Sequence, residues 1–388
     1  MKHLGDITLI HGNEIEPVDC IIGGSPCQDL SVAGKRAGLS GERSGLFAEQ
    51  IRIVKEMRKR YGKPRYMVWE NVPGAFSSNS GEDFRAVLEE ITKIADETTV
   101  IPRPPKGKWS YAGCVMGDGW SVAWRTHDAQ FWGVPQRRRR IALVADFGGE
   151  SAPEILFERE GLQRDFAESG TLRKTVAGDA ANRTGDDDRA GEGFDGYNGD
   201  LTGDVSATLG VNCGVSTGRN GVIECRGDER LCAVTDAGML TSAEDKATSL
   251  LARQYKDPPL VSYNDHTNRH HYIVRRLTPL ECERLQGYPD GWTDIGDWTD
   301  SKGKKHKSAD APRYKALGNS IALPFWFWML RRMSEYLPTG ATMGSLFDGI
   351  GGFPLCWETI HGKGSARWAS EIEEFPIAVT KLRFPEKG

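Results

Sequence analysis

Short apolar runs alternate with amphipathic stretches over the first 147 residues of the chain. Residues 18–23 (VDCIIG) and 66–69 (YMVW) are short and apolar, and each is followed by Gly, Pro or Asn, which is typical of strands buried on both faces. Between them, residues 46–60 place apolar side chains at helical spacing and end in Lys and Arg. This order predicts a βαβ unit, and residues 140–146 (RIALVAD) predict a further strand.

Regular elements return after Arg275. Thr278 suits the N-cap of a helix, Pro279 its first helical position and Glu281 its third helical position. A helix is therefore predicted from Pro279 to Leu285. A second helix is predicted over 319–336, interrupted or redirected at Pro324. Further on, the pattern predicts a strand at 343–347, a helix to Ile360, a strand at 366–370 and a helix at 373–382.

The middle of the chain, from 148 to 272, is rich in Gly, Asp, Thr and Ser, which favours long loops joining short strands; a linker is the alternative. No internal repeat is found. We therefore predict an α/β protein with a doubly wound, mostly parallel sheet and a second, smaller domain. The large domain comprises 1–147 and 312–388, and the smaller domain comprises 148–311.

Overall composition must be considered together with the local clusters of basic residues before it limits the possible functions. The chain has 388 residues, enough for two domains, and a net charge of -4, which alone argues against a nucleic-acid binder. Two basic runs, 137–140 and 302–307, nevertheless provide local patches for phosphates. The eight cysteines show no C-x-x-C pair or zinc spacing, so we expect a reducing compartment and no metal. The longest apolar stretch, 321–330, is half a membrane span, and no secretion signal is evident, so we expect a cytosolic protein.

A glycine-rich loop at 347–353 lies between a predicted strand and a predicted helix, where the backbone can approach a ligand closely. Glu371 follows about 20 residues later, at the end of the next strand, where a carboxylate can bind ribose hydroxyls. The loop lacks the G-x-G-x-x-G spacing of dinucleotide sites. These features favour a nucleoside cofactor other than NAD, with S-adenosylmethionine as the leading candidate.

Reactive side chains follow three other predicted strand boundaries. Cys27 comes just after an apolar strand, where neighbouring positive charge can hold its side chain as a thiolate. The alternative for Cys27 is a buried structural cysteine, and this is how we interpret Cys20, which lies inside the strand. Glu70 ends the strand at 66–69, although a surface carboxylate is the alternative. Strand alternation places Arg138 and Arg140 on one face, unless the arginine run is only a solvated surface.

The order and spacing of six segments resemble the motifs of the DNA (cytosine-5) methyltransferases. Residues 24–31 (GSPCQDLS) resemble the nucleophile motif, 70–72 (ENV) the glutamate motif and 136–140 (QRRRR) the arginine motif. Residues 276–289 (RLTPLECERLQGYP) are similar to the motif after the recognition region, 314–320 (YKALGNS) to the last motif, and 347–353 (FDGIGGF) to the first. The resemblance covers the whole chain except its middle.

The resemblance implies a catalytic role for each motif. The Cys27 thiolate adds to carbon 6 of cytosine, so that carbon 5 can take a methyl group from S-adenosylmethionine. Glu70 binds and protonates ring nitrogen 3, Arg138 contacts the oxygen at position 2, and Arg140 supports Glu70 or the nucleophile loop. The base must be flipped out of the duplex, and the glycine-containing loop at 29–46 has the composition of a lid over it.

The resemblance also implies binding residues. Phe347 stacks near the adenine, Gly349 to Gly352 approach the methionine moiety, and Glu371 binds the ribose. The full set expected at S-adenosylmethionine, or at its product S-adenosylhomocysteine, is Asp6, Ile7, Gly24, Pro26, Asn319, Ser320, Phe347, Asp348, Gly349, Ile350, Gly351, Gly352, Glu371 and Ile372. Asp348 stands where a small residue is frequent in the family. The residues expected at DNA are Gln28, Ser31, Arg36, Thr208 and Leu209, with 248–252 competing for the last two.

The order of the motifs is rotated relative to most of the family, in which the glycine loop opens the chain. Joining Gly388 to Met1 places Asp6 23 positions after Glu371 (17 to the end, then six), a normal spacing for a strand-helix-strand unit. This predicts a circular permutant whose two ends lie together, with older ends fused at about 338–343.

The partners implied are double-stranded DNA and, in a bacterial cell or an infected host, a possible restriction endonuclease. We expect a monomer and no membrane contact. Two alternatives remain: a transfer-RNA cytosine-5 methyltransferase, and a catalytically inactive DNA-binding regulator.

Overall fold

The structure is a computed structural model that describes residues 1–25, 45–104, 107–157 and 271–386, together with three strands between 192 and 226. Cys27 and the other expected site residues at 26–36, as well as Thr208 and Leu209, lie outside the described residues. The described part contains no helix long and apolar enough to cross a membrane.

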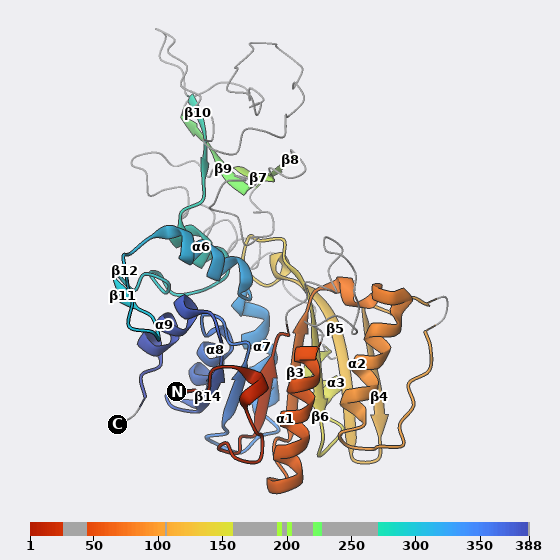
Figure 1. The fold of residues 1–388 in the computed structure, drawn as a ribbon. Coiled ribbons are helices and arrows are strands. Elements are labelled where there is room, and N and C mark those ends of the chain that lie inside the picture. Colours follow the sequence, from red (N-terminus) through yellow and green to blue (C-terminus); the bar gives the residue numbers. More distant parts are fainter. Residues whose placement is uncertain are drawn as a thin grey trace.

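An eight-stranded sheet forms the centre of the molecule, in the order β1-β14-β13-β2-β3-β6-β5-β4 (Figure 1). Its strands are β1 (Lys2–His3), β2 (Cys20–Gly23), β3 (Tyr66–Asn71), β4 (Ala112–Gly117), β5 (Trp120–Asp128), β6 (Arg139–Asp146), β13 (Met343–Leu346) and β14 (Ala366–Ser370). The pairings from β1 to β3 are all parallel, whereas β3–β6, β6–β5 and β5–β4 are antiparallel. The predicted α/β class with a mostly parallel sheet is confirmed.

Helices cover both faces of this sheet (Figure 1). The helices of the described part are α1 (Gly45–Tyr61), α2 (Glu82–Thr92), α3 (Ala152–Leu156), α5 (Pro279–Leu285), α6 (Asp310–Asn319), α7 (Leu323–Ser334), α8 (Gly352–His361) and α9 (Glu374–Arg383). Strand alternation divides the core: Ile21 and Met67 pack with α1 and α2, while Ile22 and Val68 pack with the other helices.

The two crossovers next to the centre of the sheet leave on opposite faces. The β2–α1–β3 unit uses the α1 face, and the β13–α8–β14 unit uses the other face. The switch point of the topology therefore lies between β13 and β2, which pair from Met343 opposite Cys20 to Leu346 opposite Gly23. Ligands of open α/β sheets bind beyond the carboxyl ends of the strands at such a point.

The two described ends of the chain lie side by side. The Met1 amino group donates a hydrogen bond to the carbonyl of Phe384 at 3.0 Å, and β1 pairs in parallel with β14 through Lys2 opposite Trp368. The sequence β14, α9, β1 thus completes a strand-helix-strand unit across the termini. This agrees with the predicted proximity of the ends, although Gly388 itself lies outside the described residues.

The bounds predicted for the smaller domain, 148–311, stay a prediction. A second, four-stranded sheet contains β7 (Glu192–Asp195), β8 (Asp200–Gly203), β9 (Asn220–Arg226) and β10 (His271–Arg276), all paired antiparallel. Ile155 of α3, Leu285 of α5 and Trp292 belong instead to the core of the large sheet. A two-stranded ribbon, β11 (Trp298–Thr299) with β12 (Lys305–His306), also lies beside α9 (Figure 1).

Short 3-10 helices complete the described part, at Ile7–Leu9, Pro73–Phe76, Ser78–Gly81 and Ala129–Phe131. The helix predicted over 319–336, interrupted or redirected at Pro324, begins later than predicted, because Asn319 belongs to the preceding helix. α6 ends at Asn319, three residues in extended or turn conformation follow, and Pro324 stands in the first turn of α7. A proline is tolerated there because the first helical N–H groups need no intrahelical acceptor.

Candidate active site at the carboxyl edge of the sheet

Three segments lie side by side at the carboxyl ends of β13, β2 and β3. The first is the glycine loop after β13, the second is Gly24-Ser25 after β2, which precedes Cys27 by two positions, and the third is the end of β3 itself, which contains Glu70. A Cβ atom on Gly24 would lie 2.7 Å from Glu70 Oε2, so the carboxylate contacts the backbone that leads to Cys27. The fold thus brings together motifs separated by about 320 positions of sequence.

Ser25 is held against β3 from two sides. Trp69 Nε1 donates to Ser25 Oγ at 3.1 Å, and Asn71 Nδ2 donates to the Ser25 carbonyl at 3.4 Å. Both β3 residues are buried, and the Trp69 ring packs edge-on against Phe47 at 5.8 Å between centroids. The chain that leads into the segment resembling the nucleophile motif is therefore anchored to a buried strand.

Glu70 and Arg140 form an ion pair with 2.9 Å between Oε1 and Nε, and each side chain is about 15% exposed. β3 and β6 place them there, since Glu70 lies opposite Ala142 in the antiparallel register. The predicted alternation is seen: Arg138 is buried and Arg140 is half-buried, while Arg137 and Arg139 are exposed. Arg140 thus contacts Glu70, as the resemblance implied.

Arg138 lies deeper than Arg140. Only 2% of it is exposed, and its Nη2 donates to the carbonyls of Ser320 and, at 3.3 Å, Gly318. These carbonyls belong to the last turn and the C-cap of α6, so the arginine motif is bonded to the segment resembling the last motif of the family. The expected contact of Arg138 with a cytosine oxygen stays a prediction.

The glycine loop carries two features suited to a nucleoside cofactor. Gly349 and Gly351 have positive φ, as does Phe347 at 55°, so the backbone turns sharply before α8 begins. Glu371, at the end of β14, accepts the Gly349 N–H with Oε2 at 2.8 Å and the Ile372 N–H with Oε1 at 2.7 Å. The loop and the carboxylate expected at the ribose are therefore in direct contact.

The segment after β1 lies next to the same carboxylate. Ser370 Oγ donates to the Gly5 carbonyl at 2.7 Å, which places Asp6 and Ile7 beyond the carboxyl ends of β1 and β14. Ile7 is buried in the core, and Asp6 caps a 3-10 turn through Thr8. Of the other expected cofactor residues, Ser320 is buried, whereas Asn319 and Ile372 are exposed.

Asp348 is the unusual member of the loop. Its side chain is buried, and neither carboxylate oxygen has a hydrogen-bond partner among the described residues. Burial raises the pKa of this carboxyl to about 7; the Ser345 hydroxyl opposes the rise, and the charge of Glu371 adds to it. A buried acid without a donor is costly in free energy, so its presence in this loop calls for a functional explanation.

Two aromatic residues at the site were not assigned a role from the sequence. Trp292 Nε1 donates to the Ile350 carbonyl at 2.8 Å, and Tyr288 Oη lies 2.5 Å from Ser320 Oγ. Tyr288 stands within the segment 276–289 that carries the resemblance, directly before a proline, and this was the available signal. Nothing local distinguishes Trp292 from a core tryptophan. Within the described ranges no group of His, Cys, Asp or Glu is arranged to hold a metal ion.

A family model of C-5 cytosine-specific DNA methylases matches residues 1–95 and 116–335 of the chain. The chain therefore belongs to the C-5 cytosine-specific DNA methylase family. The glycine loop lies after the matched range.

Two individual relatives share 25–30% of their residues with this chain over the aligned regions. The chain is 30% identical to a protein of Escherichia phage P1 named DNA N-6-adenine-methyltransferase, over 86% of this chain and 55% of that protein. It is 25% identical to the Type II methyltransferase M2.BsuMI of Bacillus subtilis, over 95% of this chain and 70% of the relative. It thus spans little more than half of the phage protein.

Solved structures that match this chain include the S. pombe Dnmt2 methyltransferase and the Entamoeba histolytica methyltransferase EhMeth. The first is 16% identical, with a TM-score of 0.44 and coverage of 84% of this chain and 82% of that one. The second is 14% identical, with a TM-score of 0.41 and coverage of 82% and 78%.

Proposed function

We propose that this protein transfers a methyl group from S-adenosylmethionine to carbon 5 of cytosine within a specific sequence of double-stranded DNA. The observation that carries the proposal is the meeting of three motifs at one edge of the sheet. The glycine loop and the Gly24-Ser25 entry to Cys27 follow neighbouring strands, and Gly24 contacts Glu70 of the Glu70–Arg140 pair, which lies on β3 and β6. Family membership gives this arrangement its chemical interpretation.

The residues at the glycine loop fit S-adenosylmethionine. The loop offers close backbone approach at Gly349 and Gly351, Glu371 stands at the end of the next strand for ribose hydroxyls, and the orphaned Asp348 carboxyl suits a ligand of positive charge. When bound, the cofactor supplies an electrophilic methyl group. In our proposal the protein holds the methyl group beside the target cytosine.

The base chemistry falls to the other motifs. Carbon 5 of cytosine is a poor nucleophile, and addition of the Cys27 thiolate to carbon 6 makes the ring enamine-like. Glu70, held by Arg140, would keep a proton at ring nitrogen 3 and so draw electrons from carbon 6. After methyl transfer, loss of the carbon 5 proton and elimination of the thiolate release 5-methylcytosine. The base must leave the duplex for this to occur.

The name of the phage P1 relative, an adenine N6 methyltransferase, makes the product base a point to test. The adenine amino group needs no thiolate to activate it, whereas carbon 5 of cytosine does. The combination of Cys27 with Glu70 therefore favours cytosine. We also propose that the motif order reflects circular permutation, supported by the strand-helix-strand unit that spans the termini.

Expression in a host that lacks DNA methylation tests the activity. Nucleosides from its DNA and RNA are separated by liquid chromatography and mass spectrometry, and the DNA is sequenced after bisulfite treatment. We expect 5-methylcytosine in DNA at one sequence context, none with Cys27→Ser, and normal levels with Cys114→Ser, which removes an exposed cysteine of β4 as a matched control. N6-methyladenine alone, or methylation confined to RNA, would overturn the proposal.

A further inference from the structure

The segment 286–292 joins parts of the site that belong to different motifs. It follows α5, which is preceded almost directly by β10 of the second sheet. At its start, Gln286 Nε2 donates to the Leu317 carbonyl at 2.7 Å, and Leu323 N–H donates to the Gln286 carbonyl at 2.8 Å. Gln286 therefore ties the end of α6 to the beginning of α7.

The same segment shapes the glycine loop. Trp292 donates to the Ile350 carbonyl, and the Tyr288 hydroxyl lies directly over Gly352, where a Cβ atom would be 2.4 Å from Oη. Both aromatic side chains are buried. The start of α8 can occupy its place only because Gly352 has no side chain and the phenol is held where it is.

Tyr288 also contacts the other half of the site. Its Oη is 2.5 Å from Ser320 Oγ, and the Ser320 carbonyl accepts from Arg138. Burial raises the pKa of Tyr288 far above the ordinary tyrosine value, so the phenol stays protonated and able to hydrogen-bond. A continuous series of contacts thus runs from Gly352 through Tyr288 and Ser320 to Arg138.

Asp348 is a buried acidic group at the loop end of this series. Its carboxyl is buried without a hydrogen-bond partner among the described residues. The groups that face it are Ser345 of β13, Glu371 at the end of β14 and Tyr288 itself. A cationic ligand at the loop would supply the charge that this cluster lacks, and the backbone beneath Tyr288 would then be fixed.

We propose that Tyr288 is a positioning residue that couples occupancy of the cofactor loop to the placement of Ser320 and Arg138. The inference rests on the proposed function, since the ligand of the loop is S-adenosylmethionine or S-adenosylhomocysteine. An occupied loop holds Gly352 against the phenol, the phenol holds the Ser320 hydroxyl, and the Ser320 carbonyl orients the guanidinium. Cofactor binding thereby stabilises the position of the Arg138 guanidinium.

Amide hydrogen exchange followed by mass spectrometry, with and without saturating S-adenosylhomocysteine, tests this coupling. In the wild-type protein we expect the ligand to slow exchange at the loop, 349–355, and also at 317–323, each by about fivefold or more. In Tyr288→Phe, at a ligand concentration raised to saturation, protection should persist at 349–355 and be lost at 317–323. Ser320→Ala removes the other partner of the same bond and should act alike.

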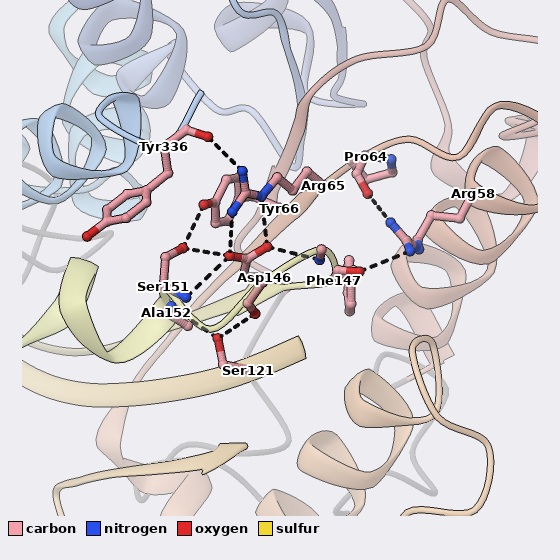
Figure 2. A network of polar contacts seen from close by, with 12 residues as sticks. Arg58, Pro64, Arg65, Tyr66, Ser121, Asp146, Phe147, Ser151, Ala152 and Tyr336 are labelled. Atoms are coloured by element: carbon pink, nitrogen blue, oxygen red, sulfur yellow. Dashed lines mark hydrogen bonds and ion pairs between the residues drawn. The ribbon is translucent and has the colours of Figure 1, made fainter. Parts of the chain in front are cut away.

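Tyr66→Phe is the matched control. Tyr66 is also a buried tyrosine that bonds one serine hydroxyl, Ser151, at 2.7 Å, but it lies at the start of β3 beside Asp146 (Figure 2). This variant should keep both protected regions, because it loses an equivalent bond outside the contact series.

The possible outcomes separate the two proposals. Protection at 317–323 that survives both Tyr288→Phe and Ser320→Ala would overturn the coupling. So would wild-type protection confined to 349–355, or loss of the distant protection in Tyr66→Phe as well. No protection anywhere with S-adenosylhomocysteine would instead count against the proposed cofactor, and hence against the proposed function.

Discussion

Replacing Asp348 by Asn should stabilise the ligand-free protein at high pH and leave it unchanged at low pH. The side chain is buried, without a hydrogen-bond partner among the described residues, and its pKa is raised from an ordinary 3.8 to about 7, chiefly by burial. Because the folded protein holds this proton more tightly than the unfolded chain, Asp348 costs no stability below about pH 4. The cost grows as the pH rises through 7 and is constant above it.

The size of the effect follows from the displaced pKa. The interval from 3.8 to about 7 corresponds to about 4 kcal/mol of folding free energy at full ionisation. That figure is a ceiling, since a loop that relaxes and admits water lowers it. Asn has nearly the same shape and no charge, so the variant removes the pH-dependent cost while it preserves packing.

Urea unfolding followed by tryptophan fluorescence, at four pH values from 5 to 8, measures the difference between the two proteins. Other titrating groups are common to both and cancel. Asp118→Asn, in the exposed turn between β4 and β5, is the control for the chemical change itself. The reasoning is refuted if the difference between Asp348→Asn and wild type does not vary with pH, or if it shrinks as the pH rises.

Three further substitutions test the site and the sheet that carries it. Gly352→Ala forces a Cβ atom to within 2.4 Å of Tyr288 Oη and should cost about 1–3 kcal/mol in urea unfolding, whereas Gly45→Ala, with open space at the start of α1, should be neutral. Arg140→Ala leaves Glu70 unpaired and should slow single-turnover methylation by about 10- to 100-fold; an unchanged rate would contradict its role. Asp146→Asn breaks the buried network with Arg65 and Ser151 (Figure 2) and should cost about 3 kcal/mol at pH 7. Burial opposes ionisation of Asp146, but the hydrogen bonds from Arg65 and Ser151 outweigh it and lower the pKa, so the cost should vanish as the pH falls through that lowered pKa.

Local signals in the sequence were sufficient for several elements. The strand at 366–370 is found at the predicted residues, and the predicted cap of α5 is a full capping box in which Thr278 and Glu281 bond each other's backbone N–H. These features depend on side chains within a few residues of one another. The placement of the glycine loop beside Gly23 was also predictable, because the resemblance fixed the order of the motifs.

Other features depend on contacts that the local pattern does not contain. The apolar run from Ile321 onward and Pro324 predicted an interrupted helix but not where the break begins: the carbonyls of Gly318 and Ser320 bind Arg138, 180 and 182 positions away, and a new helix starts at Leu323. The direction of β6, antiparallel to β3, is equally invisible in its composition. By contrast, the β4–β5 hairpin has a local sequence signal, the Asp118-Gly119 dipeptide in its turn.

The most direct test of the central claim is covalent trapping on DNA. Mixed-sequence DNA amplified with 5-fluorodeoxycytidine triphosphate contains every short target, and the fluorine at carbon 5 prevents release of the enzyme after methyl transfer. With S-adenosylmethionine present, we predict a denaturation-resistant complex whose peptide map places the base on Cys27, and none with Cys27→Ser. Absence of that complex from the wild-type protein, or attachment through another residue, would contradict the account.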